Sequence, residues 1–475
     1  MKPRSLSDVA HAVGGRLVRA GGDETAVHGV AVDSRAVAPG EVFFALRGAN
    51  ADGHGFVTDA LGRGAAGAVV RRAWPAHPEG ANAIGPLIEV DDPAQALLDL
   101  ARDERSRLDA TVIGITGSTG KTCAKDFTAA VLGRTLDVVA SRASFNNEVG
   151  LPLTLLSAGE GTEAIVCEMG SRGPGHIRLL CGIARPHIGV VTNVGVAHME
   201  LFGSPEVLRD AKAELPEALP PDGTAVLNAD DPVVIRYTDR TQARVVRFGV
   251  ASGADVRAQR VEMRPQDGLA QFDLIVPSGS AHVTLPAPGE HLVPDALAGA
   301  AVGWAMDVPV AEIARGLATA AIAPGRMEVF ETPDGFRVVN DAYNANPTSM
   351  AAALKAARSM AGRGRCIAVL GHMAELGPIA DREHERVGEL VARLGVDALV
   401  VVGRQARLIA MGAEREGVEP DRIVLCDDVA EAAAAVRTLA GPGDLVLVKA
   451  SRVERLERVA DALRHPAEVS RGIGA

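Results

Sequence analysis

The chain has 475 residues, of which 47% are hydrophobic and 23% are charged. This length exceeds what one ordinary core fills, so we expect a soluble globular protein of two or three domains. The formal net charge of −11 argues against a nucleic acid as the main partner, because a surface that binds a polyanion needs clustered Lys and Arg side chains.

No targeting or membrane signal is predicted. Residues 1–5 lead into an amphipathic segment without an apolar signal-peptide core, and no run of about 18 uncharged apolar residues occurs. The cysteines are odd in number and lack metal-ligand spacing, which is typical of reduced core thiols. We therefore expect a cytoplasmic protein without membrane insertion. The five cysteines are Cys123, Cys167, Cys181, Cys366 and Cys426.

Residues 1–108 form the first predicted unit, a small α/β domain. Short apolar runs with β-branched or aromatic residues predict its strands, and a helical pattern over residues 93–108 links it onward. The predicted strands cover residues 30–32, 42–45, 68–70 and 87–90.

The second predicted unit, residues 109–322, begins with the pattern of a parallel sheet, in which short apolar strands alternate with helices. Residues 255–285 favour antiparallel strands instead, and an Ala-rich helix is expected over residues 295–306. The predicted parallel strands cover residues 111–115, 164–167, 188–191 and 224–227.

A glycine-rich turn follows the first of these strands and is the strongest local signal in the chain. A buried strand that passes through such a turn into a helix aims backbone N–H groups at nucleotide phosphates. Lys121 adds a positive charge, and the Thr122 hydroxyl can ligate Mg²⁺. Ile115 stands where the general P-loop pattern has glycine, so this is the shorter form Thr-Gly-x-x-Gly-Lys-Thr; a chance glycine-rich turn is the alternative. The segment reads Gly114, Ile115, Thr116, Gly117, Ser118, Thr119, Gly120, Lys121, Thr122.

Two further polar residues follow neighbouring predicted strands. Glu168 comes directly after strand 164–167, and His198 follows strand 188–191. Because open parallel sheets bind ligands at the carboxyl ends of their strands, we expect both to converge with Lys121 and Thr122. A Glu168 oxygen, the Thr122 hydroxyl and phosphate oxygens would suit Mg²⁺. Taken singly, a helix-capping Glu168 and a loop His198 remain alternatives.

The third predicted unit, residues 323–475, starts at an Ala-Pro-Gly hinge and returns to βα alternation. Its predicted strands cover residues 366–370, 398–402 and 445–448. The predicted fold class is therefore α/β in three domains: a small α/β N-terminal domain, a central P-loop parallel-sheet ATPase domain and a C-terminal Rossmann-like α/β domain.

Further motifs run along the chain in a characteristic order, and the stretch Asn-Asp-Ala-Tyr-Asn-Ala-Asn-Pro-Thr-Ser-Met over residues 340–350 is the most diagnostic. In these motifs and their spacing the chain resembles the Mur ligase family, and most closely those members that add D-alanyl-D-alanine to UDP-N-acetylmuramoyl-tripeptide. The motifs cover residues 33–35, 39–48, 116–122, 146–152, 168–170, 197–198, 203–204, 211–214, 228–232, 325–328, 340–350, 375–377 and 449–452.

The resemblance implies an ATP-dependent amide ligase of peptidoglycan precursor synthesis. In such a reaction ATP converts a carboxylate into an acyl phosphate, which the amine of D-Ala-D-Ala then attacks, and the products are UDP-MurNAc-pentapeptide, ADP and phosphate. UDP-MurNAc-tripeptide and D-Ala-D-Ala would be the small-molecule partners of a monomer. Residues 1–108 would bind the UDP end, residues 109–322 ATP, and residues 323–475 the dipeptide while closing on ATP.

The resemblance also implies roles for single residues. Catalytic roles fall on Lys121, Glu168, His198, Lys212 and Arg326. ATP contacts fall on residues 114–122 and on Asp295, Arg326, Asp341 and Tyr343. Substrate contacts fall on Ser34, Arg35, Asn146, Asn147, Asn344, Asn346, Glu375, Lys449, Ser451 and Arg452.

Two Mg²⁺ ions are implied as cofactors. The first would lie on Thr122 and Glu168, and the second on His198 and a carbamylated Lys212. By itself the sequence favours a solvent-facing helix lysine at position 212, since an amine with a pKa near 10.4 is a cation at neutral pH. Carbamylation would turn that cation into an anionic oxygen ligand.

Two positions depart from the family pattern. Asp295 stands where the family usually has an Asn that contacts the nucleotide. A carboxylate roughly 6 Å from a phosphate charge would be repelled by about 3 kcal/mol at an effective dielectric constant near 20. We therefore predict weakened ATP binding, unless Asp295 turns away, is paired or serves as a helix N-cap. His372 replaces an acidic residue and can titrate near neutrality.

Alternative functions remain at this point. A sister ligase of the same fold could add another amino acid or act on a folate or a storage polymer, and residues 146–147 and 343–347 argue against it. A ligation-dead nucleotide-binding protein is conceivable because of Asp295 and His372. A simple kinase is disfavoured, because a large third domain after the hinge indicates a second substrate.

Overall fold

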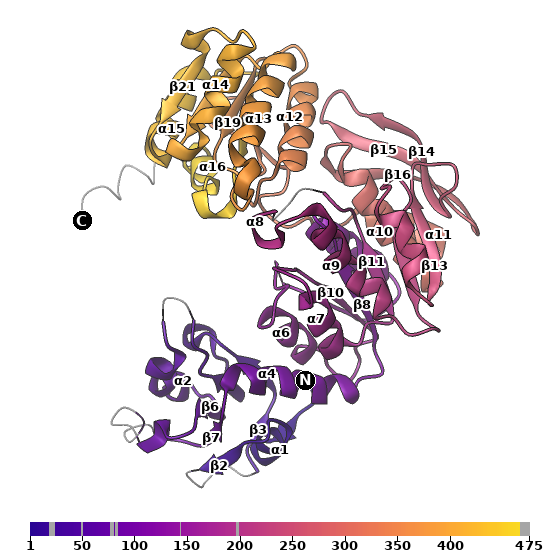
Figure 1. Ribbon diagram of the computed structural model, residues 1–475, viewed down its shortest axis with the longest axis vertical. Coiled ribbons are helices and arrows are strands. Elements are labelled where there is room, and N and C mark those ends of the chain that lie inside the picture. The colour runs from indigo at the N-terminus through magenta and orange to yellow at the C-terminus, as the bar shows by residue number, and fades with distance from the viewer. Residues whose placement is uncertain are drawn as a thin grey trace.

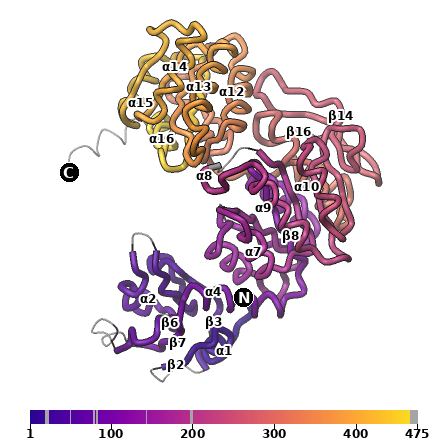
Figure 2. Tube along the Cα trace, in the orientation of Figure 1, coloured from indigo at the N-terminus to yellow at the C-terminus, as the bar shows by residue number. Residues whose placement is uncertain are grey.

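The computed structural model describes residues 1–18, 24–48, 51–76, 80, 84–142, 144–195 and 199–465. Three successive α/β bodies follow one another in an arc, with the N-terminal body in indigo at one end and the C-terminal body in orange and yellow at the other (Figure 1). The Cα trace shows the same arc (Figure 2). The three-domain α/β architecture predicted from the sequence is confirmed.

The N-terminal body is built on a five-stranded sheet in the order β2-β7-β6-β5-β4, in which β4 to β7 are parallel and β2 is antiparallel to β7. The four strands predicted here are present, each within one residue of its expected bounds. The strands are β1 Arg4–Ser5, β2 Arg16–Val18, β3 Ala26–Val27, β4 Gly29–Ala31, β5 Glu41–Phe44, β6 Gly67–Arg71 and β7 Leu87–Val90. The helices are α1 Leu6–Ala12, α2 Val57–Gly62 and α4 Pro93–Ser106.

The central body contains a nine-stranded sheet in the order β16-β15-β14-β13-β12-β11-β8-β10-β9. Strands β8, β10 and β11 are buried along nearly their whole length and mostly apolar, because helices cover both faces of this part of the sheet. The strands are β8 Thr111–Thr116, β9 Val138–Ala140, β10 Ala164–Glu168, β11 Ile188–Val191, β12 Thr224–Asn228, β13 Arg244–Gly249, β14 Val256–Met263, β15 Leu269–Val276 and β16 Gly279–Pro288. The helices are α5 Lys121–Leu132, α6 Gly150–Leu156, α7 His176–Ala184, α8 Met199–Phe202, α9 Pro205–Glu217, α10 Leu292–Ala305 and α11 Val310–Ala318.

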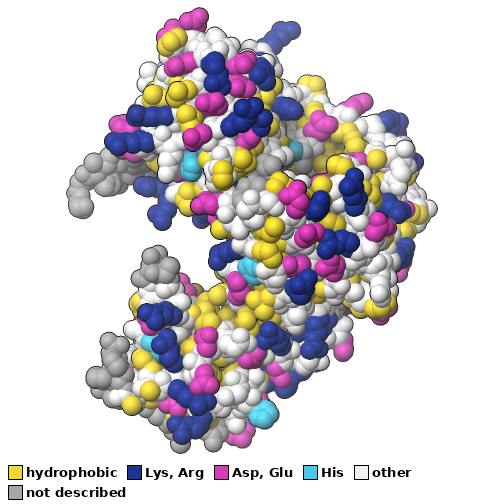
Figure 3. Space-filling view, viewed as in Figure 1, with side chains coloured by type: hydrophobic (Ala, Val, Ile, Leu, Met, Phe, Trp, Pro, Cys, Tyr) yellow, Lys and Arg dark blue, Asp and Glu magenta, His cyan; other side chains and the backbone are white. Residues whose placement is uncertain are grey.

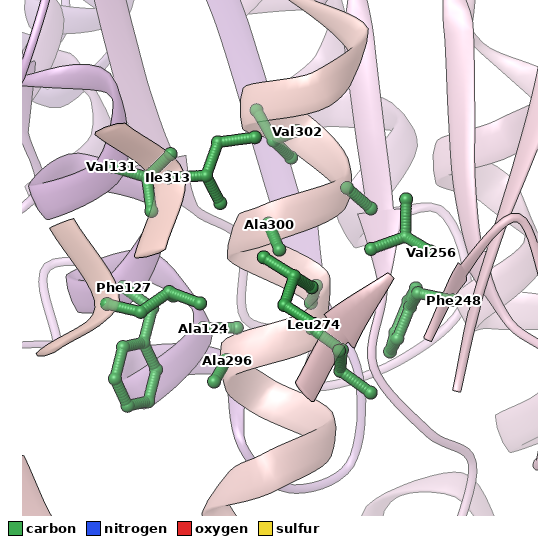
Figure 4. Packing of buried hydrophobic residues seen from close by; sticks show 14 of the residues in the cluster. Ala124, Phe127, Val131, Phe248, Val256, Leu274, Ala296, Ala300, Val302 and Ile313 are labelled. Atoms are coloured by element: carbon green, nitrogen blue, oxygen red, sulfur yellow. The ribbon is translucent and has the colours of Figure 1, made fainter. Parts of the chain in front are cut away.

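The antiparallel strands expected over residues 255–285 are also confirmed: β14, β15 and β16 pair antiparallel, and β15 alternates between buried and half-buried residues. Helices α10 and α5 pack against each other, and both contribute to the hydrophobic core that also includes residues of β13 to β16. Figure 4 shows Ala296 and Ala300 of α10 between Phe127 on one side and Leu274 on the other, with Val302 further along the helix near Ile313. This packing fixes α10 against the helix that follows the glycine-rich turn.

The C-terminal body is a doubly wound sheet in the order β17-β18-β22-β19-β20-β21, parallel except for β17. One apolar cluster lies under α12, α13 and α14, and a second under α15 and α16 on the other face. The strands are β17 Glu328–Glu331, β18 Arg337–Asn340, β19 Cys366–Leu370, β20 Ala398–Val402, β21 Ile423–Cys426 and β22 Leu445–Lys449. The helices are α12 Pro347–Ala361, α13 Ala380–Arg393, α14 Arg407–Arg415, α15 Val429–Leu439 and α16 Glu457–Arg464.

Short 3₁₀ turns complete the connections, and two of them border the site described below. These turns are η1 Ser34–Ala36, η2 Gly53–Phe56, η3 Trp74–Ala76, η4 Val234–Arg240, η5 Gly377–Ile379, η6 Arg404–Ala406, η7 Pro420–Arg422 and η8 Arg452–Glu454. Within the described ranges, no helix has the length and apolar character needed to cross a bilayer.

All five cysteines are buried and free, as predicted. Burial raises the pKa of Cys167 and of Cys181 to about 12, so these thiols stay protonated at neutral pH. They are packing residues rather than nucleophiles.

Candidate active site

The glycine-rich turn joins β8 to α5 as the sequence predicts. Gly120 takes the N-cap position of α5 with φ +77°, and Gly117 has φ +150°. A Cβ atom on Gly117 would lie 1.9 Å from Thr192 Oγ1, so only glycine fits there. Lys121 Nζ donates to the carbonyl oxygens of Gly117 at 2.8 Å and Ser118 at 3.2 Å. The lysine thus lies folded over the turn that would receive the phosphates.

The hydroxyl and the carboxylate expected to hold the first metal ion lie in direct contact. Glu168 ends β10, which pairs in parallel with β8, and Thr122 Oγ1 donates to Glu168 Oε2 at 2.8 Å. Asn146 Nδ2 donates to the other carboxylate oxygen at 2.8 Å. Glu168 is therefore held in place from both sides, and Asn146, predicted as a substrate contact, orients this carboxylate in the structure.

Lys212 lies on α9 and is buried, with 1% of its surface exposed. The solvent-facing position that the sequence alone favours is therefore wrong. Burial, followed by the positive charge of Lys121, lowers the pKa of Lys212 well below its ordinary value of 10.5. Within the described residues the Lys212 amine has no hydrogen-bond or ion-pair partner. His198, the other ligand expected for the second ion, lies outside the described residues.

Within the part of the chain that the structure describes, no three His, Cys, Asp or Glu side chains gather as a metal site. An ion beside Thr122 and Glu168 would therefore complete its shell with phosphate oxygens, water or a modified lysine. A hydroxyl and a carboxylate are hard oxygen donors of the kind that Mg²⁺ accepts, and Mg²⁺ commonly keeps several waters and substrate phosphates. The residues present fit such an ion.

The C-terminal body contributes Arg326 to the same place. Its Nη2 donates to Thr122 Oγ1 at 2.7 Å, and its guanidinium lies 4.3 Å from the centre of the Tyr343 ring. The Arg326 Nε is buried without a hydrogen-bond partner in the described structure. This unpaired N–H group beside the P-loop is suited to donate a hydrogen bond to a phosphate oxygen.

Behind Tyr343, a buried ion pair ties two loops together. Lys449 Nζ lies 2.5 Å from Asp341 Oδ2, and the two side chains are 3% and 13% exposed. Lys449 also donates to the Asn344 carbonyl at 3.0 Å, and Asp341 Oδ1 accepts from the Met327 amide at 3.1 Å. Lys449, predicted as a substrate contact, here fixes the segment that presents Tyr343.

The other predicted substrate residues of the C-terminal body also hold loops in place. Asn346 caps α12 by accepting from the Ser349 amide at 2.9 Å, and Asn344 accepts from the next amide in the chain at 2.9 Å. Ser451 Oγ accepts from the Ala374 amide at 2.8 Å. These contacts bring three loops to one edge of the sheet.

One cavity of about 600 Å³ joins these groups. The central body supplies the P-loop side, and the C-terminal body supplies the opposite wall. Predicted residues on the lining are Ser118, Thr119, Gly120, Lys121, Thr122, Asn146, Asn147, Glu168, Lys212, Asp295, Arg326, Asp341, Tyr343, Asn344, Asn346, Glu375, Lys449, Ser451 and Arg452.

Ser34 and Arg35 do not line this cavity; they lie in η1 of the N-terminal body. Asp33 caps that turn and pairs with the exposed Arg35 at 2.7 Å, which holds the pKa of Asp33 at about 2. The molecular surface is hollowed between the N-terminal and C-terminal bodies (Figure 3).

Asp295 faces the P-loop. A Cβ atom on Gly120 would lie 2.0 Å from Asp295 Oδ1, and the side chain is 6% exposed. Helix α10 begins at Leu292 with His291 at its N-cap, so the expected start at residue 295 and the N-cap role for Asp295 are both wrong. The side chain does not turn away, and within the described residues it has no hydrogen-bond or ion-pair partner. Burial raises its pKa well above 3.8, against the lowering effect of Arg326 and Lys121.

His372 contacts a second histidine that the sequence analysis missed. Its Nδ1 lies 3.1 Å from Nε2 of His384 on α13, and the two rings stack with centroids 4.9 Å apart. His384 Nε2 also accepts from the Met373 amide at 2.9 Å. No motif spacing marks His384, because the contact exists only once α13 packs beside the loop after β19.

Known proteins resemble this chain along nearly all of it. Family models described as "Mur ligase family, catalytic domain", "Mur ligase middle domain" and "Mur ligase, glutamate ligase domain" match residues 26–105, 115–303 and 325–452. UDP-N-acetylmuramoyl-tripeptide–D-alanyl-D-alanine ligase of Mycobacterium tuberculosis is 42% identical over 97% of both chains. The protein of that name from Bacillus subtilis is 35% identical over 97% of this chain and 98% of its own.

Solved structures agree with these relatives. MurF from Acinetobacter baumannii superposes with a TM-score of 0.85 at 29% identity, covering 98% of this chain and 99% of its own. MurF ligase from Thermotoga maritima, solved in complex with ADP, gives a TM-score of 0.78 at 29% identity over 92% and 97%. The ordered motifs, the shared architecture and the full-length identity lead to one conclusion: this chain belongs to the Mur ligase family.

Proposed function

We propose that this chain is an ATP-dependent acid–amino-acid ligase that joins D-alanyl-D-alanine to UDP-N-acetylmuramoyl-tripeptide and yields the UDP-pentapeptide, ADP and phosphate. The observation that carries the proposal is the meeting of the P-loop, the Thr122–Glu168 pair and Arg326 around one cavity. The full-length identity to ligases of this name supports the substrate assignment.

The residues of the cavity divide the work of phosphoryl transfer. The P-loop amides and Lys121 would hold the triphosphate, and Arg326 would neutralise charge on the γ-phosphoryl group as it moves to the peptide carboxylate. The amine of the dipeptide would then attack the resulting acyl phosphate and expel phosphate. Two bodies enclose the reacting groups, which limits hydrolysis of the acyl phosphate by water.

Thr122 and Glu168 would hold one Mg²⁺, and His198 and Lys212 a second, with Lys212 acting as a carbamate. Such ions supply charge neutralisation to the phosphates when they are bound. The environment of Lys212 favours the modification. Its lowered pKa makes the neutral amine available, and this form adds to CO₂ to give an anionic carbamate and a proton.

The division of labour among the bodies is part of the proposal. Residues 1–108, with Ser34 and Arg35, would bind the UDP end of the substrate; residues 109–322 would bind ATP; and residues 323–475 would bind the dipeptide. Asn147, Glu375 and Arg452 line the cavity where the two substrates would meet. The enzyme would act as a monomer in the cytoplasm.

The test is release of ADP and phosphate from ATP with Mg²⁺ and UDP-MurNAc-tripeptide, with and without D-Ala-D-Ala, together with the mass of the product. Release that depends on the dipeptide, with a UDP-pentapeptide product, is the expected result. Product formation with a different amino acid would indicate a sister specificity. ATP binding without any product would indicate a nucleotide-binding protein that has lost ligation.

A further inference from the structure

The loop that follows Glu168 is held by hydrogen bonds and carries one exposed arginine, Arg172. It leaves β10 and enters α7 at His176, and both oxygens of the buried Glu214 carboxylate hold it there. Gly175 N donates to Glu214 Oε1 at 2.5 Å, and Arg178 N donates to Glu214 Oε2 at 2.9 Å. Within the loop, Arg172 N donates to His176 Nδ1 at 3.1 Å. The backbone that carries Arg172 is thus fixed from α9, the helix that bears Lys212.

The Arg172 side chain is left without a partner by this arrangement. It is exposed and lines the cavity, and its guanidinium makes no hydrogen bond or ion pair with any residue that the structure describes. Most other cations on the lining are engaged. Lys121 binds P-loop carbonyls, Lys449 pairs with Asp341, Arg326 binds Thr122, and Arg452 pairs with Glu457. Lys212 is also without a partner, but it is the lysine to which the carbamate is assigned.

The position of Arg172 indicates what it would bind. The reacting carboxylate of the peptide must lie beside the γ-phosphoryl group, near Glu168 and Lys212. Arg172 lines the same cavity as Glu168 and Lys212, so the groups next to the reacting carboxylate would lie within its reach. A planar guanidinium matches a carboxylate through two parallel hydrogen bonds.

We propose that Arg172 binds a second, non-reacting carboxylate of the peptide substrate and so helps to decide which tripeptides are ligated. This inference rests on the proposed function. A ligase of solved structure from Acinetobacter baumannii is named for an alanyl-D-glutamyl-2,6-diaminopimelate substrate. Such a peptide offers two non-reacting carboxylates: one on the glutamyl residue, which uses only one of its two carboxyl groups in the chain, and one on the diaminopimelate.

The experiment compares wild type with Arg172→Gln and Arg172→Lys on three UDP-tripeptides. One ends in diaminopimelate, one ends in lysine and so lacks the side-chain carboxylate, and one has the glutamyl carboxylate amidated. Arg178→Gln is the matched control, because Arg178 is an exposed arginine on α7 that pairs with Glu217 and does not line the cavity. Melting curves establish that each variant is folded, and KM for ATP is measured alongside.

We expect Arg172→Gln to lower kcat/KM for the diaminopimelate peptide by about 10- to 100-fold, with KM for ATP unchanged and a smaller loss in Arg172→Lys. With the peptide that lacks the bound carboxylate, kcat/KM of the wild type should fall by a similar factor. The kcat/KM of Arg172→Gln should be the same with that peptide as with the diaminopimelate peptide. If this result is seen with the lysine peptide, Arg172 binds the diaminopimelate carboxylate. If it is seen with the amidated peptide, Arg172 binds the glutamyl carboxylate.

The proposal is overturned if Arg172→Gln changes no peptide by more than about twofold, or if its losses are the same for all three peptides and follow a raised KM for ATP. Failure of the proposed function is distinguishable from these outcomes, because wild type would then form no UDP-pentapeptide from any of the peptides.

Discussion

The Arg326 guanidinium donates a hydrogen bond to the Thr122 hydroxyl at 2.7 Å, across a sequence separation of 204 residues. This bond links the first segment of the C-terminal body to the helix that follows the P-loop. Thr122 donates its own proton to Glu168, so one short chain of hydrogen bonds runs from the C-terminal body to the carboxylate at the end of β10. The position of Thr122 and Glu168 beside the P-loop is therefore linked directly to the position of the C-terminal body.

Replacement of Arg326 should impair chemistry more than folding. Arg326→Lys keeps the charge but loses the planar fork that reaches Thr122 while lying on the Tyr343 ring. We expect kcat to fall by about 100-fold, as on loss of one preorganised donor to a transition state. Steady-state kinetics would measure this.

Arg464→Lys is the matched control for Arg326→Lys, because Arg464 lies 4.0 Å from the centre of the Phe330 ring in the same body and does not line the cavity. Its kcat should stay within twofold of wild type. An Arg326→Lys enzyme with kcat within threefold of wild type would contradict a role in phosphoryl transfer.

The buried Lys449–Asp341 pair should be a large contributor to the stability of the C-terminal body. Lys449→Met leaves a buried carboxylate unpaired, which costs about 3–5 kcal/mol. We expect faster hydrogen exchange in β18 and β22, measured by mass spectrometry on the full chain. The double variant Lys449→Met/Asp341→Leu should recover most of the protection without recovering ligation.

Arg358→Met provides the comparison for this pair, because the Arg358–Asp397 pair is more exposed, at 29% and 37%. Its effect should stay below about 1 kcal/mol. Equal hydrogen-exchange rates in the Lys449 and Arg358 variants would show that the buried pair contributes no more to stability than the exposed pair.

Asp295→Asn should strengthen ATP binding. The amide removes a carboxylate beside the P-loop and restores a donor, so KM for ATP should fall, most clearly at high pH where the carboxylate ionises. Because burial raises the pKa of Asp295 above 3.8, the folded state holds this proton more tightly than the unfolded state. The stabilisation it contributes is complete below pH 3.8 and is lost as pH rises through the folded-state pKa.

Asp295→Asn should therefore gain stability relative to wild type as pH rises, and unfolding curves at several pH values would measure this. An unchanged or higher KM for ATP would count against the effect on binding, and parallel pH–stability curves would count against the raised pKa.

The His372–His384 pair should make the loop after β19 sensitive to acid. Burial lowers the pKa of both imidazoles below 6.5. Their stabilising contribution is present above pH 6.5 and is lost as pH falls through the lowered values. We expect activity to fall as the pH drops below 6.5, with faster hydrogen exchange over residues 371–379.

His372→Asp tests this directly. The introduced carboxylate would stabilise a protonated His384, and the acid limb of the pH–activity profile should become flatter. A profile identical to that of wild type would show that the exchange of an acidic residue for His372 is inconsequential.

Lys212 should require CO₂ for function. Depletion of CO₂ should lower wild-type activity and added bicarbonate should restore it. The reason is that Lys212 offers oxygen ligands to a metal ion only as a carbamate, and not as the free amine. Lys212→Ala should reduce kcat by about 100-fold or more, with partial rescue by a short carboxylate such as acetate. Lys355→Ala, at an exposed lysine on α12, should respond to neither treatment. Wild-type activity that is indifferent to CO₂ depletion would exclude the carbamate.

Features that depend on local patterns could be predicted from the sequence. Continuous apolar runs predicted the buried strands β8, β10 and β11, because a strand covered on both faces has no polar side. The glycines of the P-loop were readable, because the turn needs a left-handed residue at Gly120 and leaves no room for a side chain at Gly117. The contact of Thr122 with Glu168 followed from the rule that neighbouring parallel strands end at the same sheet edge.

Contacts that depend on how distant elements pack could not be predicted from the sequence and became visible in the folded chain. Lys212 is buried because α9 presents it to the cavity, whereas an isolated helix would leave it in water. Asp295 faces Gly120 because α10 starts earlier than its composition indicates and packs against α5. The Lys449–Asp341 and His372–His384 pairs join segments that no local pattern relates. Sequence periodicity specifies the faces of single elements, and the free energy of burying those faces together selects the pairs that meet.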